Sequence, residues 1–132
     1  LNARAGAALK AAGATAATDV TGFGLLGHLG ELCAASGTGA EVQFDLVPIL
    51  DGAIQLLSQG AWAGGSKRNL EAVTERIVTT RTRDEIRLLA DAQTSGGLLV
   101  SLHPGNVEQY CELVPNAVIV GSLTGDMNLR VI

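Results

Sequence analysis

The chain has 132 residues, of which 47% are hydrophobic and 17% are charged, and its formal net charge at pH 7 is −4. This composition excludes a disordered chain, and the negative charge excludes a global basic field that would attract nucleic acid or an anionic membrane. The longest uncharged run, residues 92–107, is too short and too polar to cross a bilayer. We therefore expect one domain over residues 1–132, with neither a nucleic-acid nor a membrane partner.

The first residue and the cysteines bear on the origin of the chain. The sequence begins at Leu1 and its one methionine is Met127, which indicates a processed piece or a fragment of a longer protein. Cys33 and Cys111 lack the spacing of a metal site. Two cysteines in an acidic, aliphatic domain indicate free thiols, and we expect a cytoplasmic location.

The first two predicted elements are helices. Residues 4–14 are rich in alanine and predict a helix that ends at Gly13. Residues 14–18 are small, polar and helix-tolerant. Leucines then recur at helical spacing and predict a second helix, which ends at Gly37.

The second helix and the segment after it hold further signals. Gly27 and Gly30 lie inside the helix, where each costs about 1 kcal/mol relative to alanine, and this indicates that another backbone packs closely there. Residues 41–46 alternate between apolar and polar side chains and predict a half-buried strand. Asp51 is expected to cap a short helix that closes at Gly60.

The second half of the chain predicts a similar mixture. Residues 64–69 predict a glycine-rich loop, and residues 70–79 fit either a helix or a strand. Residues 83–90 predict a helix and residues 98–102 predict a strand. Pro104 is expected to open another helix.

Two apolar runs near the C-terminus, residues 117–123 and 129–132, predict a hairpin. Some of the predicted strands are adjacent and others are separated by helices. This combination predicts an α/β fold of the α+β kind, in which helices cover a mixed sheet.

A glycine motif is the first feature with possible chemistry. Residues 22–27 match the G-x-G-x-x-G pattern of dinucleotide-binding loops, and Glu41 follows at nearly the spacing of a ribose-binding acid. Residues 14–18 lack the buried, β-branched strand that such a site needs before it. We therefore interpret the glycines as positions where a helix packs tightly, with a dinucleotide-binding module as the alternative.

Asp19 is the second feature, in a short polar stretch with Thr18 and Thr21. By itself it is most simply an aspartate of a loop or a helix start. Its carboxylate is also a suitable ligand for a magnesium ion that bridges phosphates.

Two glycine segments, residues 64–69 and 94–97, are the third feature. Backbone N–H groups beside Lys67, Arg68 and Ser95 could bind phosphate oxygens. Neither segment has the Walker spacing, and each also fits a simple turn.

The two histidines are the fourth feature. His28 lies in the second predicted helix and is interpreted as structural, and His103 precedes Pro104 and is expected to be solvated. The sequence pattern assembles no set of nucleophile, base and orienting acid.

Three long motifs carry a family resemblance: ATDVTGFGLLGHL at residues 17–29, GGSKRNL at residues 64–70 and ADAQTSGGLL at residues 90–99. With them, the chain resembles selenophosphate synthetase (selenide, water dikinase), a member of the superfamily of aminoimidazole ribonucleotide synthetase. The resemblance extends over nearly the whole chain. Ala92 stands where the family usually has proline, which affects the stiffness of the loop.

The resemblance implies that residues 1–132 form the C-terminal domain of a longer enzyme, with the α/β fold of that superfamily. The implied reaction converts ATP, selenide and water into selenophosphate, AMP and orthophosphate, and the implied enzyme is a magnesium-dependent homodimer. In the family, the catalytic cysteine or selenocysteine, a lysine and most metal-binding aspartates lie in the N-terminal domain. No catalytic residue is therefore assigned in this chain.

Asp19 alone matches a metal ligand of the family, and it is expected to join aspartates of the N-terminal domain around Mg²⁺. Lys67 and Arg68 are the candidates for contact with ATP phosphates. Three alternatives stay open: the corresponding domain of a sister enzyme (aminoimidazole ribonucleotide synthetase or thiamine monophosphate kinase type), a dinucleotide-binding module, and a non-catalytic interaction domain. The isolated chain is expected to be inactive.

Overall fold

The computed structural model describes residues 2–132 and contains two sheets. In the smaller sheet, β1 (Ala16–Asp19) pairs with β4 (Leu98–Ser101) in the antiparallel sense. The larger sheet has the strand order β3-β6-β2-β5. Its strands are β2 (Gly39–Val42), β3 (Ile77–Thr79), β5 (Gly121–Thr124) and β6 (Leu129–Val131).

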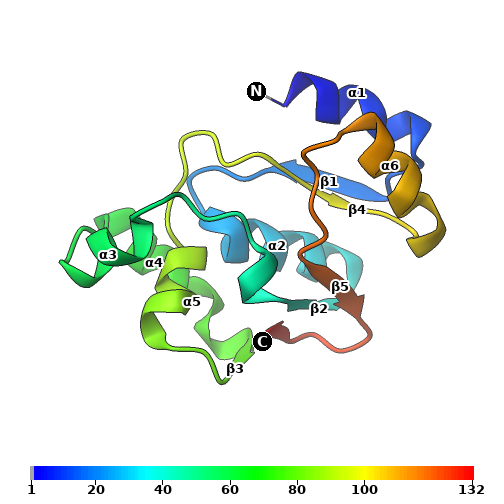
Figure 1. The fold of residues 1–132 in the computed structure, drawn as a ribbon. Helices are drawn as coiled ribbons and strands as arrows, with labels where there is room; N and C mark the ends of the chain where they lie inside the picture. The colour runs from blue at the N-terminus through cyan, green and yellow to red at the C-terminus, as the bar shows by residue number, and fades with distance from the viewer. Residues whose placement is uncertain (1) are drawn as a thin grey trace.

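Helices cover both sheets (Figure 1). Within residues 2–132, no helix combines the length and the apolar character needed to cross a membrane. The α-helices are α1 (Ala3–Ala11), α2 (Gly24–Ser36), α3 (Ala53–Ser58), α4 (Gly64–Val73), α5 (Arg83–Leu89) and α6 (Val107–Leu113). Short 3₁₀ turns are η1 (Phe44–Leu46), η2 (Thr74–Arg76) and η3 (Pro104–Asn106).

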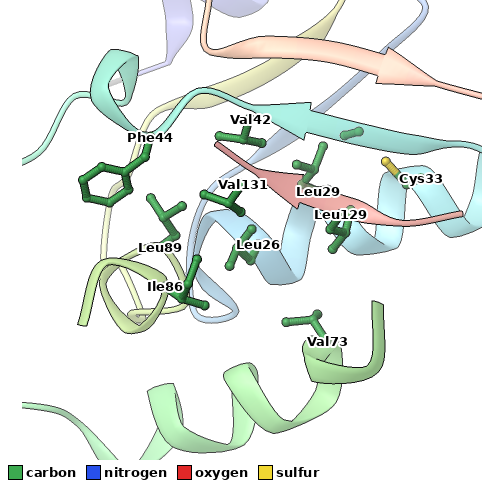
Figure 2. Close-up of a cluster of buried hydrophobic side chains, with 11 residues drawn as sticks. Leu26, Leu29, Cys33, Val42, Phe44, Val73, Ile86, Leu89, Leu129 and Val131 are labelled. Atoms are coloured by element: carbon green, nitrogen blue, oxygen red, sulfur yellow. The ribbon is translucent and has the colours of Figure 1, made fainter. Parts of the chain in front are cut away.

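The main core lies where α2, α4 and α5 pack against β2 and β6 (Figure 2). Leu26 of α2 and the two apolar residues of β6, Leu129 and Val131, are fully buried. Each fully buried aliphatic side chain of this kind contributes about 1.5–3 kcal/mol to stability. This core therefore fixes α2, and with it the loop that precedes α2, relative to the larger sheet.

A second, smaller core joins the two terminal regions of the fold. Ala8 and Ala12 of the α1 region pack with Tyr110 of α6, and Figure 1 shows these two helices on the same side of the β1–β4 pair. Burial raises the pKa of the Tyr110 phenol. Because α2 contacts β1 as well as β2, this helix links the two sheets.

The elements at the start of the chain confirm one prediction and correct another. Helix α1 overlaps the predicted residues 4–14; it begins one residue earlier, at Ala3, and ends at Ala11, ahead of Gly13 at φ +62°. Residues 14–18, described from the sequence as helix-tolerant, instead lead into β1. Thr15 N–H donates to Ser101 C=O at 2.9 Å, so pairing with β4 overrides the weak local preference of these small residues.

The predicted strand over residues 41–46 is wrong in its second half, because β2 ends at Val42. Phe44 N–H donates to Ile132 C=O, and the chain then turns through η1 so that the Phe44 ring enters the main core. The predicted C-terminal hairpin is also wrong. Strand β2 lies between β5 and β6, antiparallel to β5 and parallel to β6, so the two terminal strands never pair with each other.

Two details of capping and packing also differ from expectation. Asp51 does not cap α3, whose N-cap is Gly52 without a side-chain hydrogen bond. Gly27 and Gly30 face side chains rather than another backbone: a Cβ at Gly27 would meet the Phe23 Cβ, and one at Gly30 would contact Val73 and Leu129. The close backbone approach occurs instead at Gly24, beside the main chain of residues 90 and 91.

An ion-pair cluster around Arg81 joins η1 to α5. The guanidinium Nη2 of Arg81 lies 2.6 Å from Asp45 Oδ2, and its Nη1 lies 3.3 Å from Glu85 Oε1. The hydrogen bond from Arg81 lowers the pKa of Asp45 below 3.8, and hydrogen bonds from Thr82, followed by the charge of Arg81, lower the pKa of Glu85 below 4.5. Both carboxylates therefore favour the folded state when ionised.

The Arg81 cluster predicts a pH dependence of stability. Since both folded-state pKa values lie below the unfolded ones, the contribution is present above the unfolded values and is lost as pH falls through the folded ones. We expect Arg81→Gln to reduce the loss of stability between about pH 7 and about pH 3, measured by urea unfolding. Arg83→Gln, at the exposed first residue of α5 and two residues after Arg81, is the matched control. Identical pH dependence in both variants and the parent would contradict this account.

Candidate functional site

The structure brings the three sequence motifs together, and α4 is the element that joins them. The predicted loop over residues 64–69 is wrong, because these residues form the first turns of α4. Ser66 is fully buried in this helix; its Oγ donates to Asp91 Oδ1 at 2.6 Å and accepts from Ala92 N–H at 3.0 Å. These tertiary hydrogen bonds offset the poor helix propensity of Gly64 and Gly65.

Asn69, one turn after Ser66, ties two loops to the same helix. Its side-chain Nδ2 donates to Gly22 C=O at 2.8 Å and to Ala90 C=O at 3.2 Å. Ser66 and Asn69 are i and i+3 residues on one helix face. Ser66 reaches the loop that follows α5, and Asn69 reaches both this loop and the loop that precedes α2. The sequence did not predict that Ser66 and Asn69 bind these loops. The available signal was two short polar side chains inside a glycine-rich motif of the family resemblance.

Backbone hydrogen bonds hold the two loops against each other. Gln93 N–H donates to Thr21 C=O, and Gly96 N–H donates to Val20 C=O, both at 2.9 Å. In return, Val20 N–H donates to Gly97 C=O at 2.9 Å. Residues 94–96 are therefore fixed beside the end of β1, where Asp19 lies.

An open cleft of about 300 Å³ lies at this junction. Asp19, the last residue of β1, is exposed at its edge, and Asn2 Nδ2 donates a hydrogen bond to the Asp19 carboxylate. The other lining residues come from both loops. The cleft is lined by Asn2, Asp19, Val20, Thr21, Thr94, Ser95 and Gly96.

The cleft suits a shared metal site better than a complete one. Asp19 supplies the one carboxylate among the lining residues, and within residues 2–132 no three His, Cys, Asp or Glu side chains gather where they could hold a metal ion. Mg²⁺ in phosphoryl-transfer sites is commonly bound by one or two carboxylates, substrate phosphates and waters. Asp19 therefore fits one position in such a shell, and its role stays a prediction.

Lys67 and Arg68, the candidates for phosphate contact, are not lining residues of this cleft. Both are exposed on α4, and Lys67 Nζ lies 4.0 Å from Glu71 Oε1 on the next turn. Ser95, the third candidate beside a glycine segment, does line the cleft together with Asp19.

His28 lies closer to the cleft than the sequence indicates. Its Nε2 is 3.2 Å from Thr21 Oγ1, and its Nδ1 is 3.6 Å from Glu31 Oε2. An acid, an imidazole and a hydroxyl are thus adjacent, an arrangement that sequence analysis did not recognise. The ring is buried against Phe23, with 5.3 Å between ring centroids, so His28 supports the loop that holds Thr21. His103 accepts a hydrogen bond from Gly105 N–H in an exposed turn.

The glycine motif of residues 22–27 does follow a strand and open a helix, as a dinucleotide-binding loop would. However, within the described residues 2–132, β1 pairs with β4 alone and in the antiparallel sense, so no parallel βαβ unit surrounds the motif there. Gly24 has φ +69° and approaches the backbone of Ala90 and Asp91. The glycines therefore serve helix and loop packing.

Comparison with known proteins identifies the family of this chain. The family model for the AIR synthase related protein, C-terminal domain, matches residues 2–132. The chain belongs to this family. The α/β fold expected from the sequence, with helices covering a mixed sheet, is confirmed.

Individual relatives point to one branch of the family. Selenide, water dikinase from Pasteurella multocida is 45% identical over 102 residues, covering 77% of this chain and 29% of the relative. The protein of the same name from Photobacterium profundum is 46% identical over 103 residues, covering 77% and 30%. The chain thus spans less than a third of these relatives, and the resemblance found in its three motifs is confirmed.

Among solved structures, thiamine-monophosphate kinase from Stenotrophomonas maltophilia K279a is similar to this family member with a TM-score of 0.48 and 19% identity. The match covers 89% of this chain and 31% of that one.

Proposed function

We propose that this family member is the C-terminal domain of a cytoplasmic selenide, water dikinase, which makes selenophosphate, AMP and orthophosphate from ATP, selenide and water. The observation that carries the proposal is the identity of about 45% to proteins of that name, over three quarters of the chain. Two of the three motifs line the Asp19 cleft, and the third holds these two through Ser66 and Asn69, which supports the proposal. An N-terminal domain would supply the remaining catalytic groups, and the full-length enzyme would be a homodimer.

Asp19 would contribute a magnesium ligand and part of the nucleotide cleft. When bound, Mg²⁺ offsets the negative charge on the phosphoryl groups being transferred. The residues of this chain provide the geometry: β1 places the carboxylate at the edge of the cleft, and the amide of Asn2 orients one of its oxygens. The hydrogen bonds of Ser66 and Asn69 hold the two loops that carry the other lining residues.

The same geometry explains why the isolated domain would be inactive. A single exposed carboxylate binds Mg²⁺ weakly, because the ion loses its waters reluctantly and prefers several oxygen ligands. Calorimetric titration of the isolated chain with Mg²⁺ and ATP should therefore show no tight binding. The full-length enzyme should form selenophosphate, which ³¹P NMR detects directly in a reaction with ATP, selenide and Mg²⁺. Absence of selenophosphate from a folded, metal-supplied full-length enzyme would overturn the proposed function.

Lys67 and Arg68 provide a separate prediction for the full-length enzyme. If both side chains meet ATP phosphates, Lys67→Ala combined with Arg68→Ala should raise the KM for ATP about tenfold, with a smaller effect on kcat. Both residues are exposed, so the melting temperature should stay unchanged. The matched control combines Lys10→Ala with Arg83→Ala, two exposed cations on other helices. An unchanged KM would leave Lys67 and Arg68 as solvated charges on α4.

A further inference from the structure

The loop between α5 and β4 presents hydrogen-bond donors at the Asp19 cleft that the fold does not use. Thr94 and Ser95 are exposed at the tip of the loop between α5 and β4, and both line the cleft. Within residues 2–132, neither their hydroxyl groups nor their backbone N–H groups make a hydrogen bond. Four donors therefore face solvent at one place beside a carboxylate.

The loop that carries these donors is firmly held on both sides of its tip. The N–H groups of Gln93 and Gly96 are bonded to the segment that follows Asp19. A Cβ at Gly96 would lie only 2.8 Å from Val20 C=O, so this close approach requires glycine. Because the flanking residues are fixed, Thr94 and Ser95 are held near Asp19 before any ligand arrives, which reduces the entropy cost of binding.

The charges of the cleft select the kind of ligand that these donors fit. Hydroxyl and N–H donors bind phosphate oxygens, but the carboxylate of Asp19 repels a free phosphate, and no lysine or arginine lines the cleft to offset it. A phosphoryl group complexed with Mg²⁺ avoids this repulsion between Asp19 and the phosphate. Its cation would face Asp19 while its oxygens accept from Thr94 and Ser95.

We propose that Thr94 and Ser95 form a phosphate-binding wall, which binds a phosphoryl group that enters the cleft together with Mg²⁺. The inference rests on the proposed function and adds to it the residues that bind the phosphoryl oxygens. The phosphoryl group belongs either to the nucleotide or to released orthophosphate, since both present the same oxygens.

The test uses the full-length enzyme and the double variant Thr94→Val/Ser95→Ala. Binding is measured by calorimetry with two probes, each with Mg²⁺: inorganic phosphate and the β,γ-methylene analogue of ATP. The loss of each hydroxyl donor to a charged phosphate should weaken binding by about tenfold or more. The exchanged variant Thr94→Ser/Ser95→Thr keeps both hydroxyls and should bind nearly as well as the parent. Ser122→Ala, at an exposed serine of β5, is the control for loss of a hydroxyl elsewhere.

The outcomes distinguish the nucleotide from orthophosphate as the source of the phosphoryl group, and they test the phosphate-binding wall separately from the proposed function. Weaker binding of the ATP analogue alone assigns the wall to the nucleotide, and weaker binding of inorganic phosphate alone assigns it to orthophosphate; either result supports the proposal. Unchanged binding of both probes by a folded double variant overturns it, even where Asp19→Asn abolishes turnover. If Asp19→Asn also leaves binding and turnover unchanged, the magnesium-ligand role of Asp19 fails as well, whereas only a parent enzyme that forms no selenophosphate would overturn the proposed function itself.

Discussion

Replacement of Asp19 by asparagine in the full-length enzyme should lower turnover by about a hundredfold or more while the protein stays folded. Asparagine keeps the size of the side chain and one oxygen but removes the negative charge that a magnesium ligand needs. Because Asp19 is exposed at the end of β1, removing its charge should cost the fold little. Release of AMP across a magnesium titration measures the effect.

Asp51→Asn is the matched control for this experiment. Asp51 is also exposed, but it lies in the turn before α3 and does not line the Asp19 cleft. We expect its substitution to leave both turnover and the magnesium dependence unchanged. Near-normal turnover of Asp19→Asn at ordinary magnesium concentrations would return Asp19 to the simpler interpretation, an aspartate at the end of a strand.

A large effect on stability is expected at Gly24. This glycine has φ +69°, which costs an alanine about 1–2 kcal/mol, and its new Cβ would lie 2.7 Å from the carbonyl carbon of Ala90. The backbone of residues 90 and 91 cannot move away easily, because Asn69 donates to Ala90 C=O and Ser66 accepts from Ala92 N–H. Gly24→Ala should therefore lower the free energy of unfolding by about 3 kcal/mol, with the midpoint of urea unfolding as the measure.

Gly22→Ala provides the comparison within the same glycine motif. Gly22 lacks a positive φ, and a Cβ there would meet nothing within 4 Å. Alanine at this position should be neutral or slightly stabilising, because it restricts the unfolded chain. Equal losses of stability at Gly22 and Gly24 would contradict the packing role assigned to Gly24.

The candidate site was predicted from the sequence only in part. Residue types and spacing allowed two interpretations of Asp19: an aspartate of a loop or helix start, or a magnesium ligand. Only the resemblance to a family favoured the magnesium ligand. Spacing also identified residues 94–97 as a possible phosphate loop, but not that Thr94 and Ser95 share a cleft with Asp19. That proximity depends on hydrogen bonds between segments more than 70 residues apart, such as Gln93 to Thr21.

Local patterns alone determined the helices with strong periodicity and clear ends. Helix α2 ends at Gly37, which has φ +66°, and α5 and β4 lie within the predicted residues 83–90 and 98–102. The two helices depend on interactions between near neighbours in the chain, such as repeated apolar side chains on one face or a glycine that stops a helix. Such interactions are readable from the order of residues. Strand β4 was predicted from its apolar run, although it also needs its partner β1.

Only the tertiary structure decided the order of strands and the conformation of the glycine-rich segment over residues 64–69. Strand β2 separates the two terminal strands because it pairs with both, and no local signal in either strand records this. Residues 64–69 are helical because Ser66 and Asn69 find partners in distant loops, whose hydrogen bonds outweigh the cost of two glycines. The free energy that decides these features arises from contacts between residues far apart in the sequence, and it exists only once the chain has folded.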